Sequence, residues 1–380
     1  MYLESKPIRS RRRGVWQWFL SAIIAITVGY MLWKNQQGII TWVGFELPTP
    51  TATELPASSY LTLGDEAMAA GRNSEALAAY QRAAELDPAN PQAYARWARI
   101  LIMRGKPLEA VAVARRGVEI DSQSAEAQTA LGLAQDWSAK PLDALDSCRK
   151  AADLDPLYAL AQACLAEAYA DTGRLADADV AARKAIELAP RDAFVQRSYA
   201  YVVETSGKYD EAVIEYEKAV ALNPKLAFIY LDIARIYRIT VDNENAIIQL
   251  ERATKADPND PQAFDQLGWL YYTTGAYDEA VTQLKRAIEL DPDYALPRAH
   301  YGVVLYSHRY YEEAVAQLEK AYELGLRKEE YLLVLAMSYE YNEQCEQAIP
   351  WFEKTLEINP NSKVAQTGLE FCQNELSKGE

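Results

Sequence analysis

Apolar residues between residues 57 and 362 recur at a helical spacing, in short blocks that polar residues or glycines separate. In the stretch from Pro261 to Tyr294, for example, Phe264, Leu267 and Tyr271 lie three and four residues apart. Side chains at this spacing share one face of an α-helix. A second block follows between residues 280 and 287, so the stretch predicts two amphipathic helices joined by a turn.

The pattern repeats nine times with a period of 34 residues. Seven prolines fall on this period: Pro88, Pro156, Pro190, Pro224, Pro258, Pro292 and Pro360. When Pro88 is numbered as position 32 of the first unit, position 20 is alanine in every unit: Ala76, Ala110, Ala144, Ala178, Ala212, Ala246, Ala280, Ala314 and Ala348. Position 8 is always glycine or alanine. Small residues at both positions let two helices approach closely, so the pattern predicts an array of antiparallel helix pairs.

This pattern resembles the tetratricopeptide repeat, with a large residue near position 4, Leu-Gly at 7 and 8, an aromatic residue at 11, alanines at 20 and 27 and proline at 32. The resemblance covers residues 57–362 and implies an all-α, right-handed superhelical solenoid of about nine helix pairs. In this family the first helices line a concave surface, and nine units are expected to wrap through about a full turn. Residues 363–380 are predicted to add a capping helix, from Lys363 to about Leu376, and a tail.

The turn inside each pair is predicted to pass through the left-handed backbone region at position 15. Glycine suits a helix end in this region and occupies the position in five units. The other four units carry Ala139, Val241, Arg309 and Glu343. We therefore expect strained or slightly longer turns in these four units.

Residues 1–14 form a basic N-terminus that leads into an apolar stretch, Val15 to Trp33, of nineteen residues without a formal charge. As a helix this stretch would span roughly 28 Å, which matches the hydrocarbon core of a bilayer. Aromatic residues at both of its ends are typical of membrane interfaces. We predict an uncleaved transmembrane helix at 15–33. The alternatives are a cleaved signal peptide, whose small-residue cleavage site is missing, and a buried core helix, which the leading basic residues disfavour.

Residues 34–56 connect the predicted transmembrane helix to the repeats and contain two different segments. Gly38 to Leu47 is too short to span a membrane and is rich in β-branched and aromatic residues. It either lies on the membrane surface or pairs with a partner, or it is an ordinary extended segment. Pro48 to Pro56 is a Pro/Thr-rich linker, which predicts a semi-rigid spacer of roughly 30 Å between the membrane and the array.

The formal net charge of −15 is distributed unevenly, with +5 on residues 1–34 and −20 on the remainder. An acidic array repels nucleic acid, so we predict no nucleic-acid partner. The positive-inside rule keeps the basic N-terminus in the cytoplasm, which predicts a single-pass membrane protein with extracytoplasmic repeats. The alternative is that Lys34 and a foldable domain keep the array inside the cell.

The chain lacks the motifs of catalytic, cofactor and metal sites. It has no Gly-rich phosphate loop, no nucleophile elbow and no HExxH sequence. Because repeats and cap account for almost everything after the linker, we predict that the protein is not an enzyme and holds neither a cofactor nor a metal. Of its two histidines, His300 and His308, we expect one to be packed in a helix interface and the other to lie near a turn.

The four cysteines form two pairs that each straddle the turn between consecutive units, Cys148 with Cys164 and Cys345 with Cys372. The two members of each pair come opposite one another in an antiparallel hairpin, so an oxidising compartment would permit disulfides. The favoured expectation is nevertheless four free, buried thiols. A disulfide needs Cα atoms within about 7 Å, closer than most helix pairs allow, and free cysteine packs well in a core.

The candidate binding site consists of large aromatic residues and arginines at the first-helix positions 2, 5, 9, 12 and 13, which face the concave side in the resembled family. These residue types dominate binding energy at interfaces. The site comprises Trp137, Phe194, Tyr201, Phe228, Arg235, Arg238, Trp269, Tyr272, Tyr306 and Tyr341. The two arginines would form a positive spot that suits a peptide with an acidic or C-terminal carboxylate group. The alternative is that a tightly wound superhelix buries some of the rings.

These features together predict a membrane-anchored scaffold for protein–protein interaction. It would recruit a peptide, or assemble a cell-envelope complex, through the concave face of the repeats. The alternative is a permanent structural subunit of a membrane protein complex, in which the anchor helix and the segment around Trp42 pack against other subunits.

Overall fold

The computed structural model describes residues 24–28, 30–31 and 55–378. Residues 24–28 and 30–31 are helical and exposed. Within these ranges, no helix combines the length and the apolar character that a membrane crossing requires. Most of the predicted transmembrane helix lies outside the described residues, and so do the basic N-terminus and residues 34–54 of the connecting segment. Pro56 begins a compact unit that continues through the repeats.

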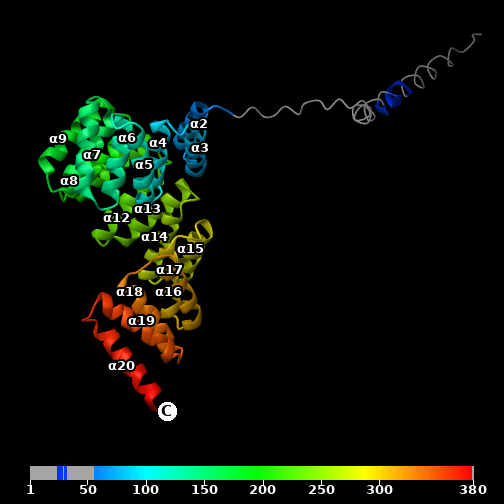
Figure 1. Ribbon diagram of the computed structural model, residues 1–380, viewed down its shortest axis with the longest axis vertical. Helices are drawn as coiled ribbons and strands as arrows, with labels where there is room; N and C mark the ends of the chain where they lie inside the picture. Colours follow the sequence, from blue (N-terminus) through cyan, green and yellow to red (C-terminus); the bar gives the residue numbers. More distant parts are fainter. Residues whose placement is uncertain (1–23, 29, 32–54, 379–380) are drawn as a thin grey trace, which may run out of the picture. The chain divides into compact units, whose positions relative to one another are not determined.

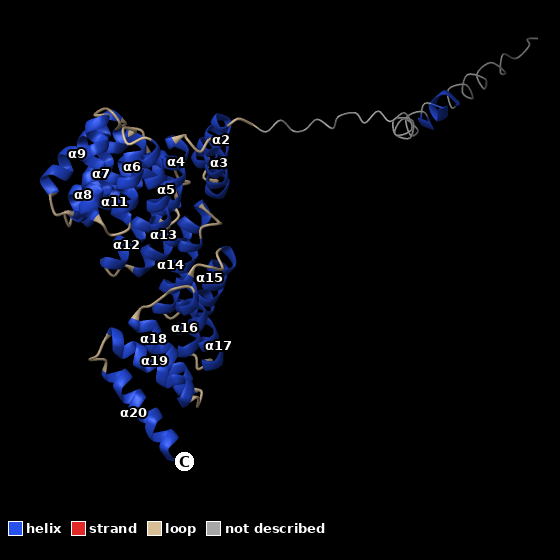
Figure 2. Ribbon diagram, in the orientation of Figure 1, coloured by secondary structure: helices blue, strands red, loops and turns tan. Residues whose placement is uncertain are grey.

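Residues 56–378 fold into helices and contain no strand (Figures 1 and 2). The first helices of the nine pairs are α2 (Ala57–Ala69), α4 (Pro91–Met103), α6 (Ala125–Trp137), α8 (Ala159–Asp171), α10 (Ala193–Thr205), α12 (Ala227–Ile239), α14 (Pro261–Thr273), α16 (Ala295–Ser307) and α18 (Glu329–Tyr341). The second helices are α3 (Asn73–Leu86), α5 (Pro107–Ile120), α7 (Pro141–Leu154), α9 (Leu175–Leu188), α11 (Tyr209–Leu222), α13 (Asn243–Ala256), α15 (Tyr277–Leu290), α17 (Tyr311–Glu323) and α19 (Cys345–Ile358). One further helix, α20 (Lys363–Lys378), packs on α19. The all-α solenoid of helix pairs is therefore confirmed.

Small residues bring the helices of each pair together, as the repeat pattern predicts. The alanine at position 20 is fully buried in all nine units. At position 8, a Cβ atom added to Gly268 would lie 2.8 Å from Leu284 Cγ and 3.1 Å from the Ala280 carbonyl oxygen. A larger residue at these positions would hold the helices apart.

The four turns without glycine adopt the same left-handed conformation as the glycine turns. Ala139, Val241, Arg309 and Glu343 have φ angles of 60°, 61°, 65° and 59°. The glycines at this position in the other five units have φ angles between 69° and 88°. The expected strain is thus present, and the turns keep their length because the flanking helices impose one geometry on every unit.

The structure pairs all four cysteines, so the expectation of free thiols is wrong. The Cα atoms are 5.5 Å apart in the Cys148–Cys164 disulfide and 4.9 Å apart in the Cys345–Cys372 disulfide. At the first bridge the close approach depends on Gly132, where a Cβ atom would lie 2.5 Å from Cys148 Sγ and 2.7 Å from Cys164 Sγ. The missing side chain leaves room for both sulfur atoms between α6, α7 and α8.

The first two units contact units far along the chain. Asn73 Nδ2, at the start of α3, donates to Asp257 Oδ2 at 2.8 Å, and both residues are buried. In the next unit, Lys106 Nζ lies 2.9 Å from Asp291 Oδ2. Units 1 to 6 (α2–α13) therefore complete one turn of the solenoid, fewer than the nine units expected, and unit 2 meets unit 7 where the next turn begins. We call units 1 to 6 the ring. Glycine permits this approach, since a Cβ atom on Gly71 would lie 2.5 Å from Lys225 Cβ.

Candidate functional site

The aromatic residues predicted for the concave face of units 3, 5 and 6 pack against one another inside the ring. The Phe228 ring lies 6.0 Å from Trp137 and 5.9 Å from Phe194, measured between centroids. Phe194 is 7% exposed and Phe228 is 5% exposed. We expected Phe194 and Phe228 to face solvent, but they are buried against each other and against Trp137, so this part of the concave face is core.

A buried arginine organises the charged residues beside these rings. Arg197, in α10, is 3% exposed and lies between Glu167 at 2.6 Å and Asp232 at 2.7 Å. Its guanidinium also stacks over the Trp137 ring at 4.7 Å and the Tyr201 ring at 5.0 Å. Because carboxylates on both sides neutralise the guanidinium charge of Arg197, its contacts stabilise the packing of units 3, 4, 5 and 6.

Arg235 belongs to the same charged cluster and is not a free positive group. It forms ion pairs with Glu204 and, at 2.8 Å, with Asp232. These carboxylates compensate its charge and hold its pKa above the usual value. Arg238, by contrast, is exposed and has no ion pair within residues 55–378. The expected positive spot is therefore reduced to Arg238.

Asp136 is the one member of the cluster that lacks a partner. The residue is 6% exposed, and its Oδ1 atom has no hydrogen-bond partner among the described residues. Burial raises the pKa of Asp136 to about 8, with further contributions from the negative charges of Asp171 and Glu167. Asp136 therefore carries a proton near neutral pH.

The sequence interpretation missed the carboxylates of this cluster because it read the concave positions only for aromatic residues and arginines, and it did not select Arg197. Asp136 and Glu204 occupy position 12, Glu167 occupies position 9 and Arg197 occupies position 5. Reading the same positions for both signs of charge would have indicated a charged cluster. Its burial depends on side chains that units 3 to 6 contribute together, which the pattern of a single unit does not show.

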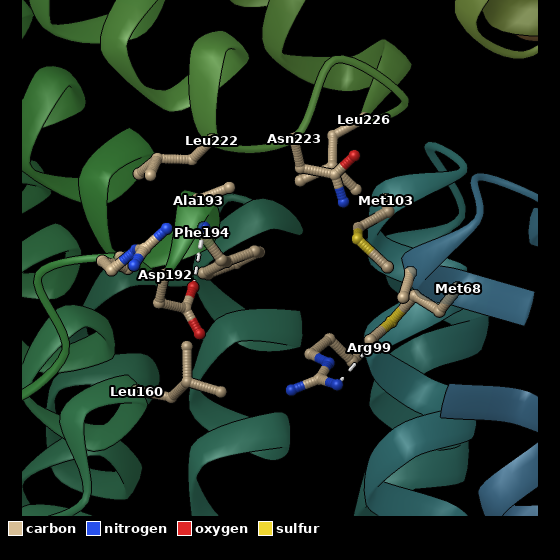
Figure 3. A pocket seen from close by; sticks show the side chains of 12 residues that line it. Met68, Arg99, Met103, Leu160, Asp192, Ala193, Phe194, Leu222, Asn223 and Leu226 are labelled. Carbon is tan, nitrogen blue, oxygen red and sulfur yellow. Dashed lines mark hydrogen bonds between the residues drawn. The ribbon is translucent and has the colours of Figure 1, made fainter. Parts of the chain in front are cut away.

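A cavity of about 270 Å³ lies inside the ring (Figure 3). Met68 and Arg99 line one side, and Leu160 and Asp192 lie opposite them. Arg99 Nη2 donates to Met68 Sδ at 3.6 Å. The sequence interpretation did not select Arg99, although this residue occupies position 9.

In units 7 to 9 the predicted aromatic residues are half-buried or, at Tyr341, exposed. Tyr272 lies 5.1 Å from Trp269 between ring centroids, and Trp269 stacks on His300 at 4.1 Å. His300 is buried, with Nδ1 2.7 Å from Asp265 Oδ1, whereas His308 ends α16 at a turn. This outcome confirms that one histidine packs in an interface and the other lies near a turn.

A second aromatic group continues this surface through units 8 and 9. The Tyr306 ring lies 6.1 Å from the Tyr341 ring, and Tyr311 stacks on Tyr341 at 5.4 Å. Tyr341 is 56% exposed. We call Trp269, Tyr272, Tyr306 and Tyr341 the aromatic strip, because they are the predicted site residues that lie in units 7 to 9, after the ring.

Family profiles identify the repeats. Tetratricopeptide-repeat profiles match residues 67–134, 165–227, 229–260 and 329–362, and a TPR-repeat profile matches residues 268–308. These matches confirm the repeats that the 34-residue period predicts. No curated protein matches the chain.

Several solved structures resemble this fold. The Cut9–Hcn1 hetero-tetramer of APC/C matches with a TM-score of 0.55 and 17% identity, over 84% of this chain and 67% of that chain. Yeast Tom70 matches with a TM-score of 0.46 and 17% identity, over 94% and 89% of the two chains. YrrB, a TPR protein with an unusual peptide-binding site, matches with a TM-score of 0.42 and 23% identity, over 50% and 97%. At these identities the likeness concerns the fold alone.

Proposed function

We propose that this chain, which carries tetratricopeptide repeats, is a membrane-anchored scaffold that recruits a protein or peptide partner through the aromatic strip. The observation that carries the proposal is the contrast between the two halves of the solenoid. Phe194 and Phe228 are buried inside the array, whereas in units 7 to 9 Trp269, Tyr272 and Tyr306 are half-buried and Tyr341 is 56% exposed. Accessible aromatic clusters of this kind are the usual centres of protein interfaces.

The proposed anchor is the apolar stretch at 15–33, with the basic residues before it in the cytoplasm and the repeats outside. The two disulfides support this location, because disulfides form and persist in oxidising compartments. Protease added to intact cells or spheroplasts should therefore digest the array. If the protease can pass the outer barrier and the array is still fully protected from digestion, the proposed orientation is wrong.

The partner test compares wild-type protein with a Tyr272→Ala/Tyr341→Ala variant, purified by affinity from native membranes and analysed by mass spectrometry. Neither ring belongs to the buried core, so we expect unchanged thermal stability and partner capture weaker by roughly 2 kcal/mol or more. Phe228→Ala is the comparison, because removing a buried ring should destabilise the array by about 3–5 kcal/mol.

Unchanged recovery of every partner by the Tyr272→Ala/Tyr341→Ala variant would contradict the proposed interface. Stoichiometric comigration of one partner after solubilisation would favour a permanent subunit of a membrane complex. Capture that is lost on dilution would favour a recruiting scaffold.

A further inference from the structure

A second surface feature lies outside the concave positions, where unit 7 meets unit 8. Here α15, α16 and the beginning of α17 surround a pocket of about 360 Å³. Four of its walls are rings, contributed by Tyr277, Tyr301, His308 and Tyr310. Asp278 and Glu313 add carboxylates. The pocket is thus an aromatic chamber with acidic groups.

A comparison with the other repeats shows that this junction lacks a basic residue at position 16. Position 16, at the start of the second helix, is basic in five units: Arg72, Lys106, Lys140, Arg174 and Lys208. In four of these units the basic group pairs with the acid at position 19 of the same unit, at distances from 2.5 to 3.7 Å. A cation beside this acid is therefore a recurring feature of the array.

Unit 8 keeps the acid but replaces the cation with a ring. Glu313 occupies position 19 and Tyr310 occupies position 16. Neither Glu313 nor Asp278 forms an ion pair within the described part of the chain. No other unit combines this Tyr with the histidine found at position 14 in unit 8. Because the other units form the same turn without these rings, the fold does not require them.

Two of the rings, His308 and Tyr277, make contacts that leave a polar nitrogen available. His308 Nδ1 lies 3.0 Å from the Val304 carbonyl oxygen, so this nitrogen donates and Nε2 is the acceptor of the neutral ring. Tyr277 meets His308 edge-on, with 4.3 Å between ring centroids. Aromatic rings, a ring nitrogen and two carboxylates therefore surround one space.

We propose that this chamber binds a basic side chain, arginine or lysine, of a partner protein. A guanidinium or ammonium group is attracted by the faces of aromatic rings and by unpaired carboxylates, and the chamber supplies both. The chain uses the same chemistry internally, where Arg327 lies 3.4 Å above the Tyr322 ring. This site goes beyond the proposed interface, because none of its residues belongs to the aromatic strip.

The basic groups nearest the chamber leave room for a ligand cation. Lys285 Nζ lies 5.5 Å from the Tyr301 centroid, on an exposed side chain of α15. Arg309, next to His308, is also exposed and does not line the pocket. The acids that line the pocket thus remain uncompensated, in an array whose overall charge is strongly negative.

The test uses the full-length protein in a non-ionic detergent and two probe peptides, acetyl-Gly-Gly-Arg-Gly-Gly-amide and its citrulline counterpart. Citrulline has the shape of arginine without the charge. Saturation-transfer NMR titrations should give roughly tenfold tighter binding for the arginine peptide. A lysine peptide should bind within about threefold of the arginine peptide, because both carry the cation.

Two variants and one control locate the binding. Tyr310→Lys places in unit 8 the base that five other units carry, so it should fold normally and abolish binding by filling the chamber with an internal cation. Glu313→Gln should weaken binding at least about threefold by removing a lining charge. Glu279→Gln is the matched control, because this acid occupies position 19 of unit 7 and does not line the pocket.

Several results would overturn the proposal. Equal binding of the citrulline and arginine peptides would show that the chamber does not recognise the positive charge. If Glu313→Gln and Glu279→Gln weaken binding equally, the peptide is attracted by the overall charge of the array and not by the chamber. Tighter binding of tetramethylammonium than of the arginine peptide would assign the chamber to quaternary ammonium groups instead.

Discussion

Val241 holds a backbone conformation that a β-branched side chain disfavours. Its φ angle is 61°, and the residue is 77% exposed, so packing compensates little for the strain. The left-handed region costs a residue with a Cβ atom about 1–2 kcal/mol. Replacing the residue with glycine recovers only part of this energy, because glycine has more conformational freedom in the unfolded chain. We expect Val241→Gly to raise the unfolding free energy by about 1 kcal/mol, measured by urea denaturation. A loss of stability would show that Val241 makes a contribution beyond its backbone.

Asp136 should make the stability of the array depend on pH. Burial raises its folded-state pKa to about 8, whereas its ordinary value is 3.8. Between these two values the folded state keeps the proton and the unfolded state loses it, so the free energy of unfolding falls as pH rises. Below the ordinary value both states are protonated, and the effect vanishes.

The variant Asp136→Asn mimics the protonated side chain at every pH. We expect it to change stability little at pH 4 and to raise the unfolding free energy by about 1–3 kcal/mol at pH 9. Thermal unfolding at several pH values measures the difference. Asp146→Asn, an exposed site on α7, should show no such trend. A stabilisation of Asp136→Asn that is the same at pH 4 and pH 9 would contradict the buried, protonated carboxyl.

At the scale of elements, the terminal helix depends on its disulfide. α20 ends the described array and contacts α18 and α19, so it has neighbours on one side. A terminal element of a solenoid lacks half of the interface that stabilises internal units. The Cys345–Cys372 bridge ties this helix to α19.

Removing this bridge should loosen α20 first. Cys345→Ala/Cys372→Ala is expected to cost about 3 kcal/mol locally, visible as faster hydrogen exchange of residues 363–378. The comparison is Cys148→Ala/Cys164→Ala, which breaks the bridge between α7 and α8 and should leave α20 unchanged. Equal exchange in α20 for the wild type and both variants would show that packing alone holds the helix.

Most elements could be predicted because the repeat encodes them locally. Position 15 adopts the left-handed conformation in the turn of every unit. At the start of α14, the Asp260 side chain caps the helix by accepting a hydrogen bond from Gln262 N at 3.0 Å, immediately before Pro261. The disulfide at Cys148 could not be predicted in the same way. Its geometry depends on Gly132 in a neighbouring helix, and glycine at position 8 is common to units with and without cysteine.

At the scale of the whole array, the same limit applies to the candidate site. Residues at equivalent positions have different surroundings, since Trp137 is half-buried against Phe228 whereas Tyr341, also at position 13, is 56% exposed. The difference arises from contacts between units, such as that of Trp137 in unit 3 with Phe228 in unit 6. A pattern with a period of 34 residues carries no information about such contacts, so the concave positions could be predicted but not their burial.

Ring closure can be tested with two glycines in the same conformation. Gly71 and Gly173 both occupy position 15, with φ angles of 72° and 77°. A Cβ atom on Gly71 would lie 2.5 Å from Lys225 Cβ, whereas one on Gly173 would meet nothing within 4 Å. Gly173→Ala should therefore cost only backbone strain, about 1 kcal/mol.

Gly71→Ala carries the same strain and also pushes unit 1 away from Lys225. The displacement should break the buried pair of Asn73 and Asp257 and open the ring, because a backbone-linked Cβ cannot move aside as a flexible side-chain end can. We expect faster hydrogen exchange in the loop at residues 257–260 for Gly71→Ala and no change there for Gly173→Ala. Equal exchange in the two variants would mean that the ring adapts to the extra atom, and that the burial of Phe194 and Phe228 depends on packing between adjacent units rather than on closure.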